Sequence, residues 1–126
     1  MTRAIADTSV FVAQETGREL DALPEEIGVS VITAAELELG VLRATDAGRR
    51  ALRLDTLSRD RSTSLIPIDP ETASCFARLA DATRSEGRKL RRLDTWIAAT
   101  ALRHGVAVLT QDKDFTKLDP VEVILL

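Results

Sequence analysis

Short apolar runs of strand length recur along the chain, and longer stretches of helical composition separate them. The apolar runs are rich in Val and Ile and do not alternate cleanly with polar residues, a pattern typical of strands that are buried on both faces of a sheet. We predict strands at Ala4–Ala6, Ile27–Val31, Leu65–Ile68, Val106–Leu109 and Val121–Leu126.

The stretches between these runs have the composition of helices. We predict helices at roughly Thr8–Gln14, Ile32–Ala44, Ala47–Arg59, Glu71–Ser85 and Thr95–His104. Strands that alternate with helices imply right-handed crossovers and a parallel sheet covered on both sides. The sequence therefore predicts an α/β fold with three layers, α/β/α, and a mostly parallel central sheet of four to five strands. We expect residues 1–126 to form a single domain.

Residues that start and stop helices stand where this pattern needs them. Asp69, Pro70 and Glu71 supply an N-cap, a proline at the first helical position and an acid in the first turn. Gly105 directly follows Arg103 and His104, in the position of a helix C-cap. These signals place the start of the fourth helix and the end of the fifth.

The composition narrows the class of protein. The chain has 126 residues, of which 44% are hydrophobic, enough for an unaided core. Cys75 is the only cysteine, so no intramolecular disulfide can form, and we expect a reducing, cytoplasmic compartment. There is no run of about 18 apolar residues that would suggest a membrane span. The formal net charge of −3 argues against binding nucleic acid by bulk electrostatics.

Two acids stand at predicted helix starts. Asp7 ends the first strand, in AIADTSVF, and Asp94 precedes the strongly apolar stretch of LDTWIAATAL. Each carboxylate is suited to capping the next helix by accepting backbone N–H groups. The helix dipole would also stabilise an ionised Asp94 that is partly buried, which suits a metal ligand. Taken singly, both acids are explained by capping.

Three further acids follow strands. Glu36 has the spacing of a capping box with Thr33, but if Ser30 caps the helix instead, Glu36 lies beyond the first turn on an apolar flank. Asp112 and Asp114 stand two residues apart in VLTQDKDF, and such a pair is commonly a solvated Asx-turn. Each of these acids again has an ordinary structural explanation.

Together, the acids point to one site. The carboxyl ends of parallel strands share one edge, where open α/β sheets bind ligands, so Asp7, Glu36, Asp112 and Asp114 should converge there. The same rules place Asp94 at the opposite edge, because it opens the helix that leads into the fourth strand. Carboxylates gathered in one cleft repel each other, and a divalent cation relieves the repulsion. Oxygen ligands without nearby His or Cys suit Mg²⁺ or Mn²⁺ rather than Zn²⁺.

Four motifs along the chain resemble those of the PIN domains, specifically the VapC toxins of bacterial toxin–antitoxin pairs. In order they are IADTSVFVA, SVITAAELELGVLRA, LDTWIAATALRHG and VLTQDKDF, and they cover nearly the whole chain. The resemblance implies a parallel sheet between helices and a Mg²⁺- or Mn²⁺-dependent endoribonuclease. It also implies that Asp94 joins the other acids, against the expectation from the sheet edges.

The resemblance also implies roles for particular residues. The acids that it makes catalytic and metal-binding are Asp7, Glu36, Asp94 and Asp112. Asp114 matches a position that is acidic in some members, and we include it as a further metal ligand. Ser9 and Thr110 fit supporting positions that hold a ligand or a water. The cleavage would use water as the attacking group and leave a 5′-phosphate and a 3′-hydroxyl.

The partners that the resemblance implies are an RNA substrate, a VapB-like antitoxin whose C-terminal segment lies over the acidic cleft, and a second copy of the chain in a homodimer. Both protein contacts could use the apolar faces of the second and third helices. Their candidate residues are Leu37, Val41, Leu52 and Leu57. A place in the core explains each of these side chains equally well.

A basic run, RSEGRKLRR, occupies residues 84–92 with five basic residues against Glu86. Such a run is commonly a solvated loop. It leads into Asp94, however, so Arg88, Lys89, Arg91 and Arg92 are candidates for holding RNA phosphates. Without the five site acids the formal net charge changes from −3 to +2, which weakens the objection to an RNA substrate.

Two other functions stay open. Asp7, after the first strand, could be the phosphoacceptor of a phosphoryl-handling or signalling α/β domain. Ser9 stands where a DxD phosphatase has its second acid, and the paired acids of a receiver domain are missing near the first strand. The chain could also be a catalytically inactive PIN-like binding module, although such a module has little reason to keep four acids together.

Overall fold

The computed structural model describes residues 3–17, 23–61 and 65–126, and their strands form one parallel sheet. The strands are β1 (Arg3–Ala6), β2 (Glu26–Ser30), β3 (Leu65–Ile66), β4 (Ala107–Thr110) and β5 (Val123–Leu125). They lie in the order β3-β2-β1-β4-β5, and each neighbouring pair is parallel. The predicted fold class and the five predicted strands are confirmed, with ends that differ by a few residues.

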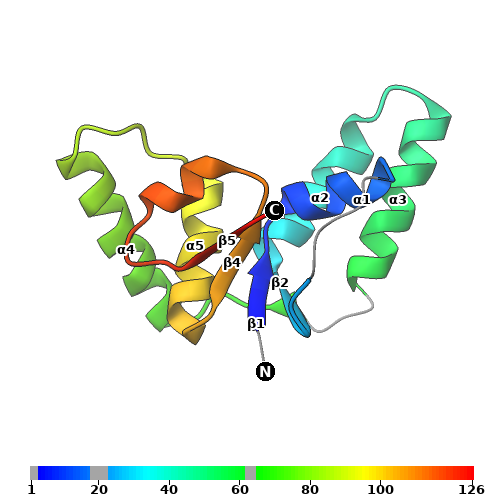
Figure 1. Cartoon of the computed structure of the whole chain (residues 1–126). Coiled ribbons are helices and arrows are strands. Elements are labelled where there is room, and N and C mark those ends of the chain that lie inside the picture. Colours follow the sequence, from blue (N-terminus) through cyan, green and yellow to red (C-terminus); the bar gives the residue numbers. More distant parts are fainter. Residues whose placement is uncertain (1–2, 18–22, 62–64) are drawn as a thin grey trace.

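Helices alternate with these strands as predicted (Figure 1). They are α1 (Thr8–Glu15), α2 (Val31–Arg43), α3 (Ala47–Arg61), α4 (Pro70–Ser85) and α5 (Arg92–His104), followed by the short 3-10 helix η1 (Lys113–Lys117). Asp69 caps α4, and Gly105 ends α5 with a left-handed φ of 65°. The start of α5 differs from the prediction, because Arg91 is its N-cap and Asp94 lies inside the first turn.

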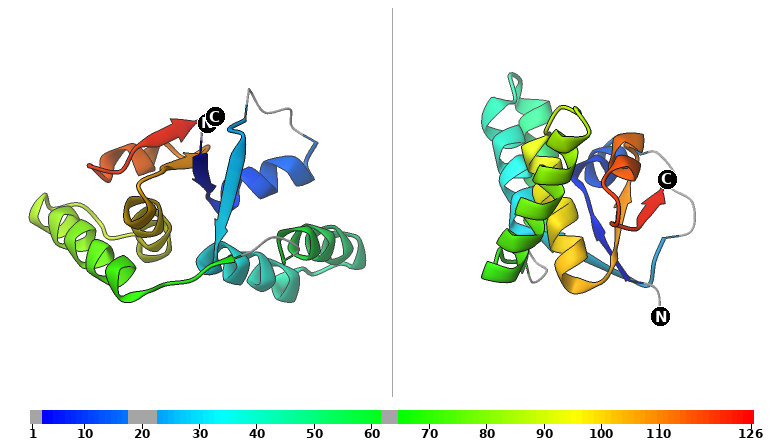
Figure 2. Two further views of the ribbon diagram at one scale, coloured as in Figure 1. Left: turned by 90° about the horizontal axis from the view of Figure 1, so that it is seen from below. Right: turned by 90° about the vertical axis from the view of Figure 1, so that its left-hand side faces the viewer.

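The side chains of the strands alternate between two packed faces. Ile5 and Val108 belong to a core cluster with Leu79 of α4 and Ile97 of α5. The residues of the other face form a second cluster with Val10 of α1; they are Ala4, Ala6 and Leu109. Figure 2 shows α1 on one side of β1, and α4 and α5 on the other. The sheet is therefore buried on both faces, as the unbroken apolar runs indicated.

The helix pair α4–α5 decides which edge of the sheet receives Asp94. Arg103, near the end of α5, forms an ion pair with Asp69 at the start of α4, with 3.1 Å between Nε and Oδ2. The two helices are thus antiparallel, and α5 ends where it leads into the amino end of β4. Its first turn consequently lies at the carboxyl edge, near the ends of β1 and β4 (Figure 1). The placement of Asp94 at the opposite edge was wrong, because a helix that precedes a strand runs against it.

Two smaller expectations concern the single cysteine and membrane spans. Cys75 is 9% exposed and packs in the larger core cluster as a small apolar side chain. Within the described ranges, no helix has the length and apolar character that crossing a membrane requires.

Candidate active site and metal centre

Asp7 is buried at the end of β1 and is held by two hydroxyl residues. Its Oδ1 accepts the backbone N–H of Ser9, at 2.5 Å, and so caps α1. Its Oδ2 accepts hydrogen bonds from the Ser9 hydroxyl, at 3.1 Å, and from the Thr110 hydroxyl. With donors at both oxygens, the carboxylate has one fixed orientation. Capping and a place in the site are therefore compatible, and both predicted supporting residues contact Asp7.

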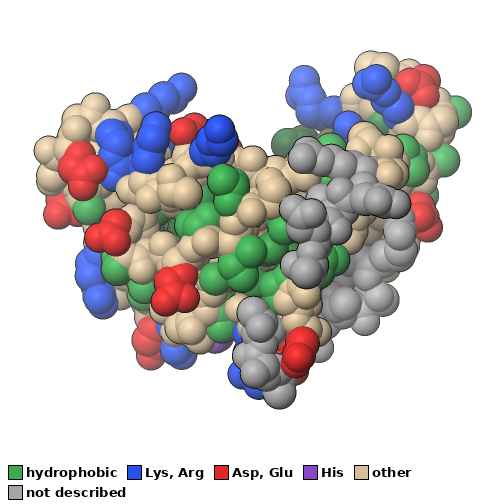
Figure 3. Space-filling view, in the orientation of Figure 1, with side chains coloured by type: hydrophobic (Ala, Val, Ile, Leu, Met, Phe, Trp, Pro, Cys, Tyr) green, Lys and Arg blue, Asp and Glu red, His purple; other side chains and the backbone are tan. Residues whose placement is uncertain are grey.

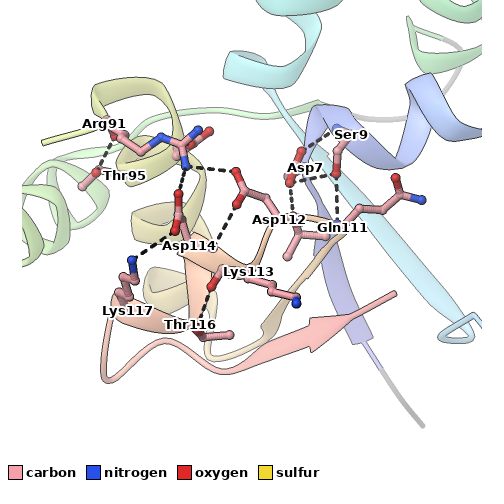
Figure 4. A network of polar contacts seen from close by, with 12 residues as sticks. Asp7, Ser9, Arg91, Thr95, Gln111, Asp112, Lys113, Asp114, Thr116 and Lys117 are labelled. Carbon is pink, nitrogen blue, oxygen red and sulfur yellow. Dashed lines mark hydrogen bonds and ion pairs between the residues drawn. The ribbon is translucent and has the colours of Figure 1, made fainter. Parts of the chain in front are cut away.

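The loop after β4 brings two more acids to this edge. The Thr110 hydroxyl accepts the backbone N–H of Asp112, at 2.9 Å, and Asp112 Oδ1 accepts that of Asp114, also at 2.9 Å. The backbone N–H of Gln111 donates to the Ser9 hydroxyl, at 3.1 Å, which ties the loop to α1. Figure 4 shows this chain of contacts. The Asx-turn expected for the pair is present, and it leaves Asp112 Oδ2 for another partner.

Glu36 reaches the site from the second turn of α2. Ser30 caps this helix by accepting the backbone N–H of Thr33, at 3.2 Å, so the capping-box interpretation of Glu36 is wrong. Glu36 Oε1 instead accepts the hydroxyl of Thr8, the residue after Asp7, at 2.7 Å. This bond links the start of α1 to α2, so the end of β2 joins the ends of β1 and β4 as the third strand end at the site.

Asp94 lies where the other negative charges meet. Burial is the largest cause that raises the pKa of its carboxyl from 3.8 to about 6. The Arg91 guanidinium opposes this rise, and the carboxylates of Asp7, Glu36 and Asp112 add to it. Asp7, Glu36 and Asp112 are therefore close enough to Asp94 for their charges to act on its carboxyl. A carboxyl whose pKa is raised by burial and by neighbouring charges is typical of functional sites.

One cation, the guanidinium of Arg91, bridges the acids of this cluster (Figure 4). Its Nε lies 3.2 Å from Asp94 Oδ2, and its Nη1 lies 3.0 Å from Asp112 Oδ2 and 2.8 Å from Asp114 Oδ2. These charges, Asp94 first among them, raise the pKa of Arg91 above its ordinary value. Asp114 therefore belongs to the cluster through Arg91, and Arg91 neutralises part of its charge.

The donor set fits Mg²⁺ or Mn²⁺ in its chemistry, because it offers carboxylate and hydroxyl oxygens from several elements. Its present geometry is that of a charge cluster, since no group of three or more acids, His or Cys in the described parts of the chain could hold a metal ion. Arg91 stands between three of the acids, so a cation that joined Asp94 to Asp112 would have to displace its guanidinium. The acids are suited to binding a cation, and in this structure the Arg91 guanidinium is the cation that they contact.

The structure also adds two residues that the sequence analysis did not assign, Thr8 and Lys117. Lys117 Nζ lies 3.2 Å from Asp114 Oδ1, one turn along η1. The only sequence signals were the hydroxyl that follows Asp7 and the i,i+3 spacing of a Lys after an acid.

Of the four basic residues predicted to hold RNA, Arg91 contacts the acids, and Arg92 is exposed at the start of α5.

The remaining two predicted basic residues line a cavity beside the acids. Arg88 and Lys89 lie at its wall, with Arg91, Asp94 and Asp114 between it and the rest of the cluster. Arg88 is also paired with Glu86, with 2.8 Å between Nη2 and Oε2. The solvated-loop interpretation thus describes only part of the run, because three of its basic side chains face the site or the cavity.

Comparisons with known proteins bear on this arrangement. The family model of the PIN domain matches residues 4–120. The chain is 42% identical over 125 residues to Ribonuclease VapC5 of Mycobacterium tuberculosis, covering 95% of this chain and 93% of that protein. It is also 42% identical over 124 residues to Ribonuclease VapC4 of the same species, covering 97% and 95%.

A solved structure agrees in fold. The crystal structure of VapBC-5 from Mycobacterium tuberculosis, a member of the VapBC family of toxin–antitoxin systems, contains a chain that is 39% identical. The superposition has a TM-score of 0.90 and covers 100% of both chains. The resemblance that the four motifs suggested is confirmed at the level of family and fold.

Proposed function

The chain belongs to the PIN-domain family, and we propose that it is a metal-dependent endoribonuclease, the toxin of a VapC-type toxin–antitoxin pair. The relatives named ribonucleases support an RNA substrate, since identity to them extends over nearly the whole chain. The observation that carries the proposal is the nearness of Asp7, Glu36 and Asp112 to Asp94, where burial first, and these three carboxylates next, raise the pKa of Asp94 to about 6. We treat residues 1–126 as one domain in this proposal.

The four acids would hold Mg²⁺ or Mn²⁺, with Asp7, Asp94 and Asp112 binding directly or through water. Bound metal would supply charge neutralisation at the phosphate and an acidified water. Asp7 is suited to ligation because Ser9 and Thr110 fix its carboxylate. Glu36, which accepts the Thr8 hydroxyl, would bind metal or orient the attacking water. Asp114 would contribute at the outer side of the cluster.

In the proposed reaction, the oxygen of water attacks phosphorus on the side opposite the 3′-oxygen. The bond between phosphorus and the 3′-oxygen breaks, and the leaving oxygen takes a proton. The products are a 5′-phosphate and a 3′-hydroxyl, and the ribose 2′-hydroxyl does not react. Basic side chains of the run at residues 84–92 would hold the flanking phosphates, which makes RNA binding sensitive to salt.

The rival role of Asp7 as a phosphoacceptor is less well supported. The Asp7 residue is 5% exposed, and both of its carboxylate oxygens accept hydrogen bonds. Hydrogen bonds to both oxygens make the carboxylate a weaker nucleophile and so disfavour attack by Asp7 on a phosphoryl donor, whereas Oδ1, which accepts the Ser9 N–H, keeps a second lone pair for a metal ion. An inactive binding module is distinguished from the proposed enzyme only by an assay for cleavage.

Exposed leucines make the α2–α3 hairpin our candidate for protein contacts. Leu42 is 72% exposed, and Leu39, Leu52 and Leu54 are between 44% and 52% exposed. We propose that a VapB-like antitoxin covers this surface, since the related solved structure is of a toxin–antitoxin system. The homodimer that the resemblance implies stays a prediction for light scattering.

Two of the leucines predicted for these contacts lie in the core instead. Leu37 and Leu57 are 5% and 4% exposed, so they cannot contact a partner. Of the other two predicted residues, Val41 is half-buried and Leu52 lies on the exposed surface described above.

The decisive experiment compares RNA cleavage by the parent, Asp94→Asn and Asp81→Asn. Asp81 is an exposed acid of α4 and serves as the matched control. With Mg²⁺ the parent and Asp81→Asn should cut RNA to 5′-phosphate ends, as mapped by ligation of the products, and Asp94→Asn should not. Cleavage by the parent in excess chelator, or by Asp94→Asn, would contradict the metal mechanism.

A further inference from the structure

A cavity of about 390 Å³ opens beside the acid cluster. Its walls come from the end of α4, the loop that follows, the first turn of α5, and η1. The residues that line it are Thr83, Arg88, Lys89, Arg91, Asp94, Thr95, Asp114, Phe115, Lys117 and Leu118. Its volume lies within the range of small-ligand pockets. The cavity and the proposed active site share Asp94, Asp114 and the bridging Arg91.

The inner part of this cavity is apolar. Phe115 and Leu118 line it, and because they are only 2% and 8% exposed, each presents a small part of its side chain to the cavity. The hydroxyls of Thr83 and Thr95 are engaged in hydrogen bonds to the carbonyls of Leu79, at 2.8 Å, and Arg91, at 2.6 Å. The two threonines therefore offer mainly their methyl groups. A ligand that enters this far must bring a flat or apolar part.

The rim of the cavity is cationic. Arg88, Lys89, Arg91 and Lys117 carry four positive charges against the two acids, Asp94 and Asp114. Lys89 forms no ion pair within the described part of the chain, whereas the other three cations each have an acidic partner. Figure 3 shows Lys and Arg side chains gathered on the side of the molecule that carries α4 and η1. Lys89 is thus the cation most free to bind an anion.

The turn that ends α4 holds this rim in place. Gly87 has a left-handed φ of 70°, and the backbone N–H of Arg88 donates to the carbonyl of Thr83, at 3.0 Å. The backbone N–H of Gly87 donates to the carbonyl of Arg84, also at 3.0 Å, which completes a Schellman turn. The loop therefore folds back over the end of α4, and the cavity is a built feature of the fold.

We propose that this cavity receives one nucleotide of the RNA, next to the phosphate that is cut. The base occupies the apolar interior over Phe115 and Leu118, and the phosphate of that nucleotide meets Lys89 at the rim. This inference rests on the proposed ribonuclease function, because it is the shared residues Asp94 and Asp114 that place the nucleotide beside the site of cleavage. The cavity thereby adds binding energy at one nucleotide position without reading the edge of the base.

The charge of the cavity favours RNA over a peptide of the antitoxin. A nucleotide combines a flat base with an anionic phosphate, which matches an apolar interior and a rim with a net charge of +2. An antitoxin segment that neutralised the acids at Asp94 and Asp114 would carry cations, and this rim would repel them. We therefore assign the cavity to the substrate.

To test this proposal, a chemical label is attached inside the cavity after the protein has folded, so that the label cannot interfere with folding. Lys89→Cys is labelled with a bulky maleimide, and Arg78→Cys, at an exposed position of α4 away from the cavity, receives the same label as the control. The native Cys75 is buried, and treating the parent with the reagent shows whether it reacts. Unlabelled Lys89→Cys separates the loss of charge from the blocking of the cavity.

Two measurements are made on each protein. The first is the affinity for a short single-stranded RNA in chelator, and the second is the rate at which the same RNA is cut with Mg²⁺ when the enzyme is not saturated. Labelled Lys89→Cys should bind RNA roughly ten-fold more weakly, as expected for the loss of one held base. It should also cut this RNA more slowly, while its affinity for Mn²⁺ stays that of the parent.

Each outcome decides between the two proposals. If labelled Lys89→Cys binds and cuts RNA like labelled Arg78→Cys, the cavity does not hold a nucleotide. If the label leaves RNA binding unchanged but prevents binding of purified antitoxin, the cavity is a peptide site and our assignment is wrong. A parent that binds RNA through the cavity but never cuts it would overturn the ribonuclease function and support the nucleotide site.

Discussion

Two carboxylates at the starts of neighbouring helices, Asp69 and Asp94, have opposite electrostatic environments. Asp69 accepts the backbone N–H and the hydroxyl of Thr72, both at 2.8 Å, and meets Arg103. The hydrogen bonds from Thr72, with a smaller contribution from Arg103, lower the pKa of Asp69 to about 2. Burial and three neighbouring acids raise the pKa of Asp94 to about 6.

The difference between them separates a structural from a functional use of the same residue type. At the amino edge of the sheet, Asp69 has donors for its charge and ties α4 to α5. At the carboxyl edge, Asp94 has Arg91 as its cation and is crowded by other acids. The contacts of Asp69 stabilise the fold, whereas the surroundings of the ionised Asp94 destabilise it. A bound metal ion would remove the repulsion between Asp94 and its neighbouring acids, so a metal site explains why the fold keeps this destabilising arrangement.

The largest expected effect is a gain in stability from Asp94→Asn. A folded pKa of about 6 against 3.8 unfolded means that ionising Asp94 destabilises the fold, and the penalty grows as the pH rises through this window. The substitution should raise the free energy of unfolding by up to about 3 kcal/mol at pH 7.5 and by less than about 1 kcal/mol at pH 4. Urea denaturation in chelator at both pH values measures the two differences.

Asp81→Asn is the matched control for that experiment, because it removes an exposed acid from the same helix pair. Its free energy of unfolding should stay near that of the parent at both pH values. Equal stabilisation by the two variants would mean that the general loss of negative charge, rather than the crowding at Asp94, is responsible.

Asp69→Ala should act in the opposite direction. The lowered pKa of Asp69 means that its ionised form stabilises the fold above pH 3.8, and that this contribution disappears as the pH falls through about 2. Loss of the cap and of the ion pair to Arg103 should lower Tm by roughly 3–6 °C at pH 7. RNA cleavage measured well below Tm should be unchanged. If Asp69→Ala had a normal Tm but impaired cleavage, Asp69 would act in function rather than in stability, and the contrast with Asp94 would be wrong.

The smallest effect is expected for Arg91→Gln, which should change the binding of metal and of RNA. Without the guanidinium, Asp94, Asp112 and Asp114 lose the cation that they share. We expect Mn²⁺ to bind several-fold more tightly, as followed by electron paramagnetic resonance without RNA. RNA binding should weaken, and the slope of its dependence on log salt should fall by about 0.7, one phosphate contact.

Arg78→Gln, an exposed arginine of α4, is the control for the general loss of one positive charge. If Arg91→Gln binds Mn²⁺ no better than this control, Arg91 does not compete with the metal.

Most of the secondary structure could be predicted from the sequence because its signals are local. Unbroken Val- and Ile-rich runs indicated strands buried on both faces, and the cap residues Asp69 and Gly105 marked helix ends that the structure reproduces. The acids after β1, β2 and β4 could be assigned to one edge by the geometry of a parallel sheet. Glu36 was ambiguous because two possible caps, Ser30 and Thr33, stand three residues apart, and only packing chooses between them.

The sequence by itself determined the α/β class, the family motifs and the candidate acids, because each depends on residue type and on spacing along the chain. Only the tertiary structure decided that Asp94 faces the acids, since its position depends on the antiparallel packing of α4 and α5. The bridge from Arg91 to Asp112 and Asp114, more than twenty residues away, and the cavity beside it have the same origin. Ion pairs and cavity walls formed by residues far apart in the chain leave no local sequence pattern, because the packing of the core brings those residues together.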